Sequence, residues 1–110
     1  PMIQTKIVEA WAQSESYALS IYHTASKILA GGSIGSESSL GKIFWSELDH
    51  MMHQTALKIL GASAELSEDS QNDAAKWIKG FMFSYAGPIY AGTNEIQKNI
   101  IAERLLGLPR

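Results

Sequence analysis

The sequence predicts an all-α fold, an up-down bundle of four helices in which residues 1–110 form one domain. Apolar residues recur every three or four positions over most of the chain, which is the period of an α-helix. Glycine-rich and Gly-Pro segments interrupt this periodicity and mark the ends of the predicted helices. Apolar and polar residues nowhere alternate between turn dipeptides, as they would in a half-buried β-strand.

The first predicted helix covers residues 2–30. Its apolar stripe consists of Ile3, Ile7, Trp11, Ala18, Ile21, Ala25 and Ile28. Ser14 lies within this stripe, and its small side chain favours the close approach of another helix there. Three glycines within residues 31–35 end the helix, because glycine is costly in a helix interior.

The second predicted helix begins after a serine cap, Ser36 or Ser38, and ends at Leu60, before Gly61. Two neighbouring apolar stripes run along it, formed by Leu40, Phe44, Leu48, Met51, Thr55 and Ile59 and by Trp45, Met52, Ala56 and Leu60. A helix that is apolar over so much of its circumference needs cover on two sides. One long neighbouring helix supplies one cover. The second cover comes from one of three sources: the remaining helices, a further part of the protein, or another subunit.

Residues 62–73 are predicted to form a polar, acidic loop. Ser70 with Asp73 is a predicted N-terminal cap for a third helix, which ends at the helix-breaking pair Gly87-Pro88. The apolar residues of this helix are Trp77, Ile78, Phe81, Met82 and Tyr85.

The last predicted helix runs from Asn94 to Leu106, and Asn94 with Gln97 forms a predicted capping box at its start. Gly92, just before it, lacks the side chain that would keep a ligand away from the backbone. The free N–H groups and partial positive charge of a helix start can receive an anion such as a phosphate. An ordinary capped turn is the other interpretation of residues 92–95.

Composition excludes several classes of function. A net charge of −2 offers no electrostatic footprint for nucleic acid or for an anionic membrane. The absence of cysteine excludes disulfides and thiolate metal sites. No apolar run approaches the roughly 18 residues of a membrane span, so we expect neither nucleic acid nor a membrane as partner.

Other polar and aromatic groups have simpler interpretations. Glu47, His50 and His53 are spaced three apart, but a zinc site needs at least three well-placed ligands, so we expect a solvated or interface face and no metal. The aromatic residues at helical spacing are interpreted as core. Tyr90 is the exception, because it adjoins the glycine turn and its hydroxyl needs a polar partner. Neither a Ser-His-Asp arrangement nor an acid–base carboxylate pair is present.

Residues 89–110 resemble the C-terminal signature of the acyl-CoA dehydrogenase family, whose members end in a similar Gly-Thr-x-Glu-Ile-Gln-x-x-Ile-x-Ala-x-x-Leu-Gly run. Residues 39–48 look like the start of the family's central C-terminal helix, and residues 56–62 look like its Gln-x-x-Gly-Gly segment. The resemblance covers essentially the whole chain but only the C-terminal helical domain of a full dehydrogenase. We therefore expect a piece of a longer protein, without its N-terminal helical domain, its β domain and the first helix of the C-terminal bundle.

The resemblance implies roles for two segments. Thr93, Asn94 and Glu95 match the family's FAD-contacting turn, and Gly92 matches a position beside the substrate thioester. A second set matches a segment that contacts the FAD of a neighbouring subunit: Lys58, Ile59, Leu60, Gly61 and Ala62. Without the resemblance, Gly61 would be interpreted as a plain helix stop. The resemblance also implies that a subunit interface is the second cover of the second predicted helix.

Ala91 is the main departure from the family pattern. In many relatives a glutamate at this position removes the α proton, and alanine cannot accept a proton. Others carry the glutamate on an earlier helix, which we expect this chain to lack. We therefore assign no catalytic residue here. Lys58 and Ala62 also depart from the usual Gln and second Gly, and the methyl of Ala62 narrows the approach of a cofactor.

The resemblance implies an FAD-dependent flavoprotein of fatty acid metabolism, an oxidoreductase that desaturates acyl-CoA thioesters at a CH–CH bond. The implied partners are the acyl-CoA substrate, other subunits in a homo- or hetero-oligomer (a dimer or homotetramer) and an electron-acceptor flavoprotein. A bacterial cytoplasm and a mitochondrial matrix both fit. We expect the isolated 110-residue chain to be inactive. The alternatives are a non-catalytic helical partner subunit and a bare oligomerisation module.

Overall fold

The computed structural model describes residues 1–65 and 73–109, and this part of the chain is helical without strands. Its elements are α1 (Met2–Leu29), α2 (Glu37–Leu60), α3 (Ala62–Glu65), α4 (Asp73–Ser84), α5 (Asn94–Ile100) and a π-helical turn, η1 (Ile101–Leu105), that continues α5. The predicted all-α class is confirmed. No helix in the described ranges is both long and apolar enough to cross a membrane.

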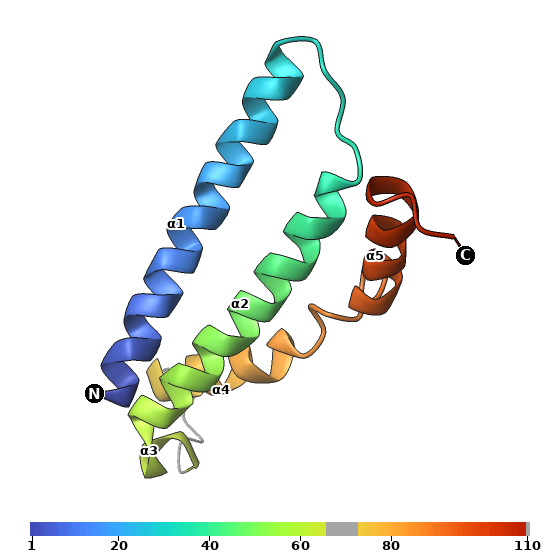
Figure 1. Ribbon diagram of the computed structural model, residues 1–110. Coiled ribbons are helices and arrows are strands. Elements are labelled where there is room, and N and C mark those ends of the chain that lie inside the picture. Colours follow the sequence, from blue (N-terminus) through green and yellow to red (C-terminus); the bar gives the residue numbers. More distant parts are fainter. Residues whose placement is uncertain (66–72, 110) are drawn as a thin grey trace.

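Helix α2 is the central element of the structure. Helix α1 runs antiparallel to it, α4 crosses its C-terminal half, and α5 lies beside its N-terminal half (Figure 1). Among the described helices, the backbone of α1 lies close to that of α2 alone, and the backbones of α4 and α5 approach neither α1 nor each other. The predicted up-down four-helix topology is therefore not confirmed, because α4 has 12 residues and α5 only 7, too short to run along the 24 residues of α2.

Two local predictions are corrected. Thr93, not Asn94, is the N-cap of α5, and its Oγ1 accepts the N–H of Ile96 at 3.3 Å. The Gln97 amide does not close a capping box but donates to the carbonyl of Ala91 at 3.0 Å. The predicted loop over residues 62–73 contains the short helix α3.

Of the two serines proposed as caps for the second helix, Ser36 takes the N-cap position of α2, but its side chain makes no capping hydrogen bond. Ser38 lies within α2 and its hydroxyl donates to Gly35 at 3.1 Å. The predicted cap at Ser70 lies outside the described residues.

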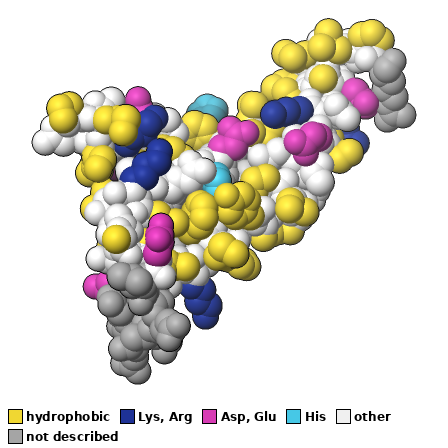
Figure 2. Space-filling model, turned by 90° about the horizontal axis from the view of Figure 1, so that it is seen from below, with side chains coloured by type: hydrophobic (Ala, Val, Ile, Leu, Met, Phe, Trp, Pro, Cys, Tyr) yellow, Lys and Arg dark blue, Asp and Glu magenta, His cyan; other side chains and the backbone are white. Residues whose placement is uncertain are grey.

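The described chain has a very small core. Its buried hydrophobic residues are Leu48 and Ala74, and α1 buries none. The accessible surface is 7931 Å², whereas a compact monomer of 12.0 kDa exposes about 6,000 Å². The radius of gyration is 17.1 Å, against about 13 Å for a compact domain of this length. Figure 2 shows hydrophobic side chains gathered over much of one face. Apolar surface of this extent is typical of an interface.

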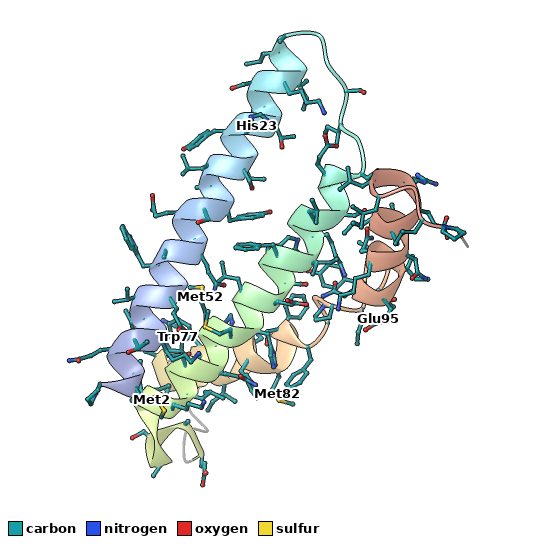
Figure 3. All side chains as sticks on the ribbon, in the orientation of Figure 1. Met2, His23, Met52, Trp77, Met82 and Glu95 are labelled. Atoms are coloured by element: carbon teal, nitrogen blue, oxygen red, sulfur yellow. The ribbon has the colours of Figure 1, made fainter. Side chains whose placement is uncertain are left out.

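The two apolar stripes of α2 meet different neighbours. Phe44 of the first stripe stacks on Tyr17 of α1, with ring centroids 5.9 Å apart. Trp45 of the second stripe packs against Tyr90 at 6.1 Å. The segment after α4 therefore supplies part of the second cover. Met52 of the second stripe is exposed, close to Trp77 between α1 and α2 (Figure 3).

Small residues allow α4 and the segment after it to lie close to α2. A Cβ at Gly80 would overlap the imidazole of His53, and a Cβ at Gly87 would lie 3.3 Å from the Cβ of Ser46. Ser46 and Ser84, both fully buried, lie where these elements meet. This close packing places the following turn against α2.

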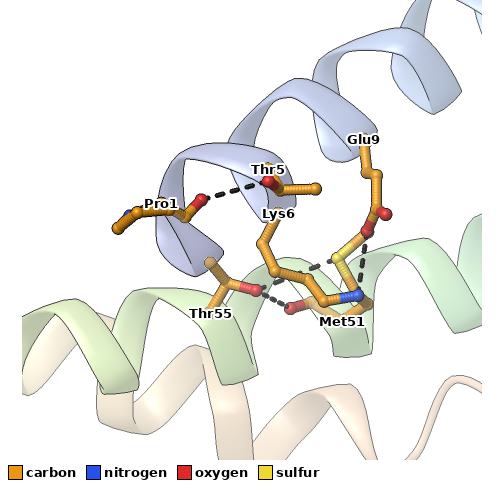
Figure 4. Close-up of polar contacts among 6 residues, drawn as sticks. All are labelled: Pro1, Thr5, Lys6, Glu9, Met51 and Thr55. Atoms are coloured by element: carbon orange, nitrogen blue, oxygen red, sulfur yellow. Dashed lines mark hydrogen bonds and ion pairs between the residues drawn. The ribbon is translucent and has the colours of Figure 1, made fainter.

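Polar contacts at the N-terminal end of α1 stay within single helices. Lys6 pairs with Glu9 at 2.8 Å, and Thr55 donates to the carbonyl of Met51 at 2.9 Å (Figure 4). At the other end, Lys27 of α1 reaches Glu37 at the start of α2, with Nζ 2.7 Å from Oε1. The two long helices are thus linked by an ion pair beside their connection.

The Lys27–Glu37 pair gives a pH-dependent prediction. The hydrogen bond from Lys27 holds the pKa of the Glu37 carboxyl below its ordinary value. A carboxyl with a lowered pKa stabilises the fold above its ordinary pKa, and this contribution is lost as the pH falls through the lowered value. Lys27→Met should return the Glu37 pKa toward normal in an NMR titration. An unchanged pKa in the variant would contradict the pairing. Because both side chains are exposed, only a small effect on stability is expected.

Candidate functional site

The turn before α5 has a left-handed backbone at two successive residues. Ala91 has a φ of 54° and Gly92 a φ of 86°. Glycine adopts this conformation freely, but a residue with a Cβ is strained there by about 1–2 kcal/mol. A Cβ on Gly92 would also lie 2.8 Å from the side-chain nitrogen of Gln97. Both residues are exposed, so the backbone of this turn is open to a ligand.

Asn94 is anchored rather than exposed. Its relative accessibility is 5%, and its backbone N–H donates to the carbonyl of Pro88 at 2.9 Å. Its Oδ1 accepts from Lys42 Nζ at 2.7 Å, and its Nδ2 donates to Ser46 Oγ at 3.1 Å. The side chain that was predicted to cap α5 therefore holds α5 onto α2, and the cofactor role of residue 94 stays a prediction.

The capacity of the α5 start to bind an anion is reduced by bonds within the chain. The amides of Asn94, Ile96 and Gln97 donate to Pro88, to the Thr93 side chain and to the Thr93 carbonyl. Among the hydrogen bonds of the described residues, the Glu95 amide has no acceptor. The Glu95 carboxylate is exposed beside it (Figure 3). The outward groups of this turn are therefore the backbone of residues 91–92 and Glu95.

Residues 58–62 lie at the opposite end of α2 (Figure 1). Gly61 has a φ of 55°, and its N–H donates to the carbonyl of Leu57 at 3.0 Å. Lys58, Ile59, Gly61 and Ala62 are exposed and Leu60 is half-buried. From Lys42 to Lys58 the helix rises about 24 Å, so the two sets of predicted cofactor residues are not brought together within one chain.

The histidines of α2 have partners in the chain. His50 Nδ1 lies 2.8 Å from Ser84 Oγ, and its ring packs edge-on to Tyr85 with centroids 4.4 Å apart. His53 Nδ1 lies 3.3 Å from Asp49 Oδ1. Glu47 is exposed. Within residues 1–65 and 73–109, no three His, Cys, Asp or Glu side chains are arranged to hold a metal ion.

Two features were not found by sequence reasoning. One is the pairing of Lys42 and Ser46 with Asn94. Lys42 and Ser46 are four apart on α2 and share a face of the helix, which is a signal that the sequence contained. The other is an open, mainly apolar groove of about 900 Å³ between the C-terminal half of α1 and the N-terminal half of α2. Its lining includes Tyr17, Leu40, Phe44 and Lys42.

Comparison with known proteins identifies the chain. The sequence profile described as "Acyl-CoA dehydrogenase, C-terminal domain" matches residues 1–106. The chain belongs to the acyl-CoA dehydrogenase family. The resemblance found in residues 89–110 is thereby confirmed.

The acyl-CoA dehydrogenase relationship extends to two curated mycobacterial proteins. The chain is 32% identical, over its whole length, to the acyl-CoA dehydrogenase IpdE1 of Mycobacterium tuberculosis H37Rv and to that of Mycolicibacterium smegmatis. It spans 28% and 26% of the lengths of these proteins. No solved structure matches the chain.

Proposed function

We propose that this chain acts as the C-terminal helical domain of an FAD-dependent acyl-CoA dehydrogenase, contributing to FAD binding and to subunit packing. The observation that carries the proposal is the match of residues 1–106 to the C-terminal domain of that family. When bound, FAD supplies the hydride acceptor for α,β-desaturation of an acyl-CoA thioester. The role of this chain is to hold and orient the cofactor beside the substrate.

The turn at residues 91–95 fits one side of a flavin site. Gly92 presents backbone without a side chain, so a planar ring system or a thioester can approach it closely. The exposed Glu95 carboxylate can accept hydrogen bonds from hydroxyl or amino groups of the cofactor. A cofactor site normally buries most of its ligand, and this exposed turn forms one wall only, so the remaining walls come from other parts of the assembly.

Proton abstraction is not assigned to this chain. By the family resemblance, Ala91 matches the position of the catalytic glutamate of many relatives, and its methyl group cannot take a proton. In the proposed enzyme a carboxylate from outside this chain removes the α proton. Residues 58–62, at the opposite end of α2 from the turn and mostly exposed, are proposed to contact the FAD of a neighbouring subunit.

The proposed biological setting follows the named relatives. Both are called acyl-CoA dehydrogenases and both are bacterial, so we propose a bacterial cytoplasm, an acyl-CoA substrate and an electron-acceptor flavoprotein. The mitochondrial alternative has no support from these relatives. Fatty acid metabolism is the corresponding process.

The flavin contact is tested with Glu95→Gln and Gly92→Ala in the assembled flavoprotein. Each change should weaken FAD binding about tenfold, the first by removing a charged acceptor and the second by straining a left-handed residue. The measurement is the FAD dissociation constant, obtained by reconstituting the apoprotein and following flavin absorbance. Glu9→Gln, which removes an exposed carboxylate on the polar side of α1, is the control. Unchanged FAD affinity in both turn variants would refute a flavin role for this turn.

A second candidate function is favoured by Ala91. A chain without the base could be a non-catalytic partner that assembles with a complete dehydrogenase subunit. Affinity purification at native expression level distinguishes a domain of a complete dehydrogenase from a non-catalytic partner. A second dehydrogenase chain at equal stoichiometry supports the partner function, whereas a single active polypeptide excludes it.

A further inference from the structure

Lys42 and Ser46 join the α5 start to α2 through the side chain of Asn94. Lys42 is half-buried, Ser46 is fully buried, and their bonds to Asn94 span about 50 positions of sequence. No ion pair of the described chain includes Lys42, so its ammonium group faces a neutral amide rather than a carboxylate. This arrangement fixes the position of Asn94 on the helix surface.

The donors and acceptors around Asn94 determine which way its side-chain amide faces. Ser46 has one hydroxyl proton, and the Ile43 carbonyl at 3.0 Å is a nearer acceptor for it than Asn94 Oδ1 at 3.4 Å. Its oxygen therefore accepts from Asn94 Nδ2, and Asn94 Oδ1 faces the ammonium of Lys42, which can only donate. Loss of Lys42 removes the charged donor of the buried Asn94 Oδ1, and loss of Asn94 leaves Ser46 with its bond to the Ile43 carbonyl alone.

We propose that Lys42 is a positioning residue for the 91–95 turn, and that Asn94 acts as its tether to α2 rather than as a cofactor contact. The proposal rests on the proposed role of this turn in FAD binding. Asn94 directs its side chain inward to Lys42 and Ser46, whereas its neighbour Glu95 is exposed. Tethering residue 94 therefore sets the direction in which Gly92 and Glu95 face the cofactor.

The test compares Lys42→Met with Lys42→Arg in the assembled flavoprotein. Lys42→Met keeps a long apolar side chain but removes the donor, and Lys42→Arg keeps a charged donor. Lys76→Met, which breaks only an exposed pair with Asp73 on α4, is the matched control. The readouts are amide hydrogen exchange at Asn94, Ile96 and Gln97, the FAD dissociation constant, and the global unfolding midpoint.

We expect Lys42→Met to speed exchange at these three amides and to weaken FAD binding, each about tenfold, as for the loss of one hydrogen bond to a charged donor. The unfolding midpoint should fall modestly, because one hydrogen bond to a charged donor is lost, and exchange in α4 should change little. Lys42→Arg should restore most of the exchange protection and of the FAD affinity. Lys76→Met should behave like the wild type.

Three outcomes would overturn the inference. Wild-type exchange at the turn in Lys42→Met would show that the lysine does not hold it. Faster exchange in the whole chain, with a lowered midpoint and no rescue by arginine, would show a general structural role. The Glu95→Gln variant separates these results from failure of the proposed function. If Glu95→Gln weakens FAD binding and Lys42→Met does not, the flavin contact stands and the positioning role falls.

Discussion

Replacing Asn94 with leucine is expected to lower the free energy of unfolding by about 3 kcal/mol, the sum for one charged and one neutral hydrogen bond. Leucine has nearly the same shape as asparagine, so packing changes little, but Lys42 Nζ and Ser46 Oγ lose the partners that they have at 2.7 and 3.1 Å. Ser46 is fully buried and cannot turn to water instead. The measurement is denaturant unfolding of the assembled protein.

The control for this change lies on the same helix. Asn99 is exposed on α5, so Asn99→Leu should change the free energy of unfolding by no more than about 0.5 kcal/mol. Equal effects of the two substitutions would show that the loss at Asn94 reflects helix propensity rather than its bonds to α2.

The double variant Val8→Glu and Tyr22→Glu is expected to weaken subunit association about 100-fold. Both side chains lie on one face of α1, 63% and 69% exposed. They line neither the groove around Tyr17 and Phe44 nor a smaller one around Trp11 and Trp77. Burying such side chains in an assembly contributes about 3 kcal/mol together, and a charge in their place must be desolvated. Sedimentation across a range of protein concentrations measures the change.

The matching control adds the same charges to the polar side of the same helix. Thr5→Glu with Gln13→Glu, both exposed, should leave association within about threefold of the wild type. If the apolar pair also leaves the mass and the unfolding midpoint unchanged, this face of α1 is solvated in the assembly. A lowered midpoint with unchanged mass would show that another part of the same subunit covers it.

The sequence predicted most of what depends on local pattern. The apolar period located α1, α2, α4 and α5, and glycine at positions 31 and 61 marked helix ends, because these signals depend on residues only a few positions apart. The family followed from residues 89–110, and the profile match over residues 1–106 confirms it. The cofactor roles of residues 58–62 and 92–95 remain predictions.

What the sequence did not predict depends on contacts between distant residues. Asn94 followed by Gln97 has the pattern of a capping box, but Lys42 and Ser46 engage the asparagine from about 50 positions away, so the neighbouring Thr93 takes the cap. The positions of the other helices around α2 could not be predicted from the periodic pattern either. Period shows which face of a helix is apolar but not which neighbour covers it.

The scarcity of interior residues has a consequence for how the protein is made. With Leu48 and Ala74 as the hydrophobic residues buried within the described chain, hydrophobic burial inside the chain opposes its conformational entropy only weakly. A fold of this kind is stabilised chiefly by whatever covers its apolar helix faces, in the same polypeptide or in another subunit. During synthesis these faces favour aggregation until they are covered. Conditions that delay this covering should therefore lower the yield of folded protein.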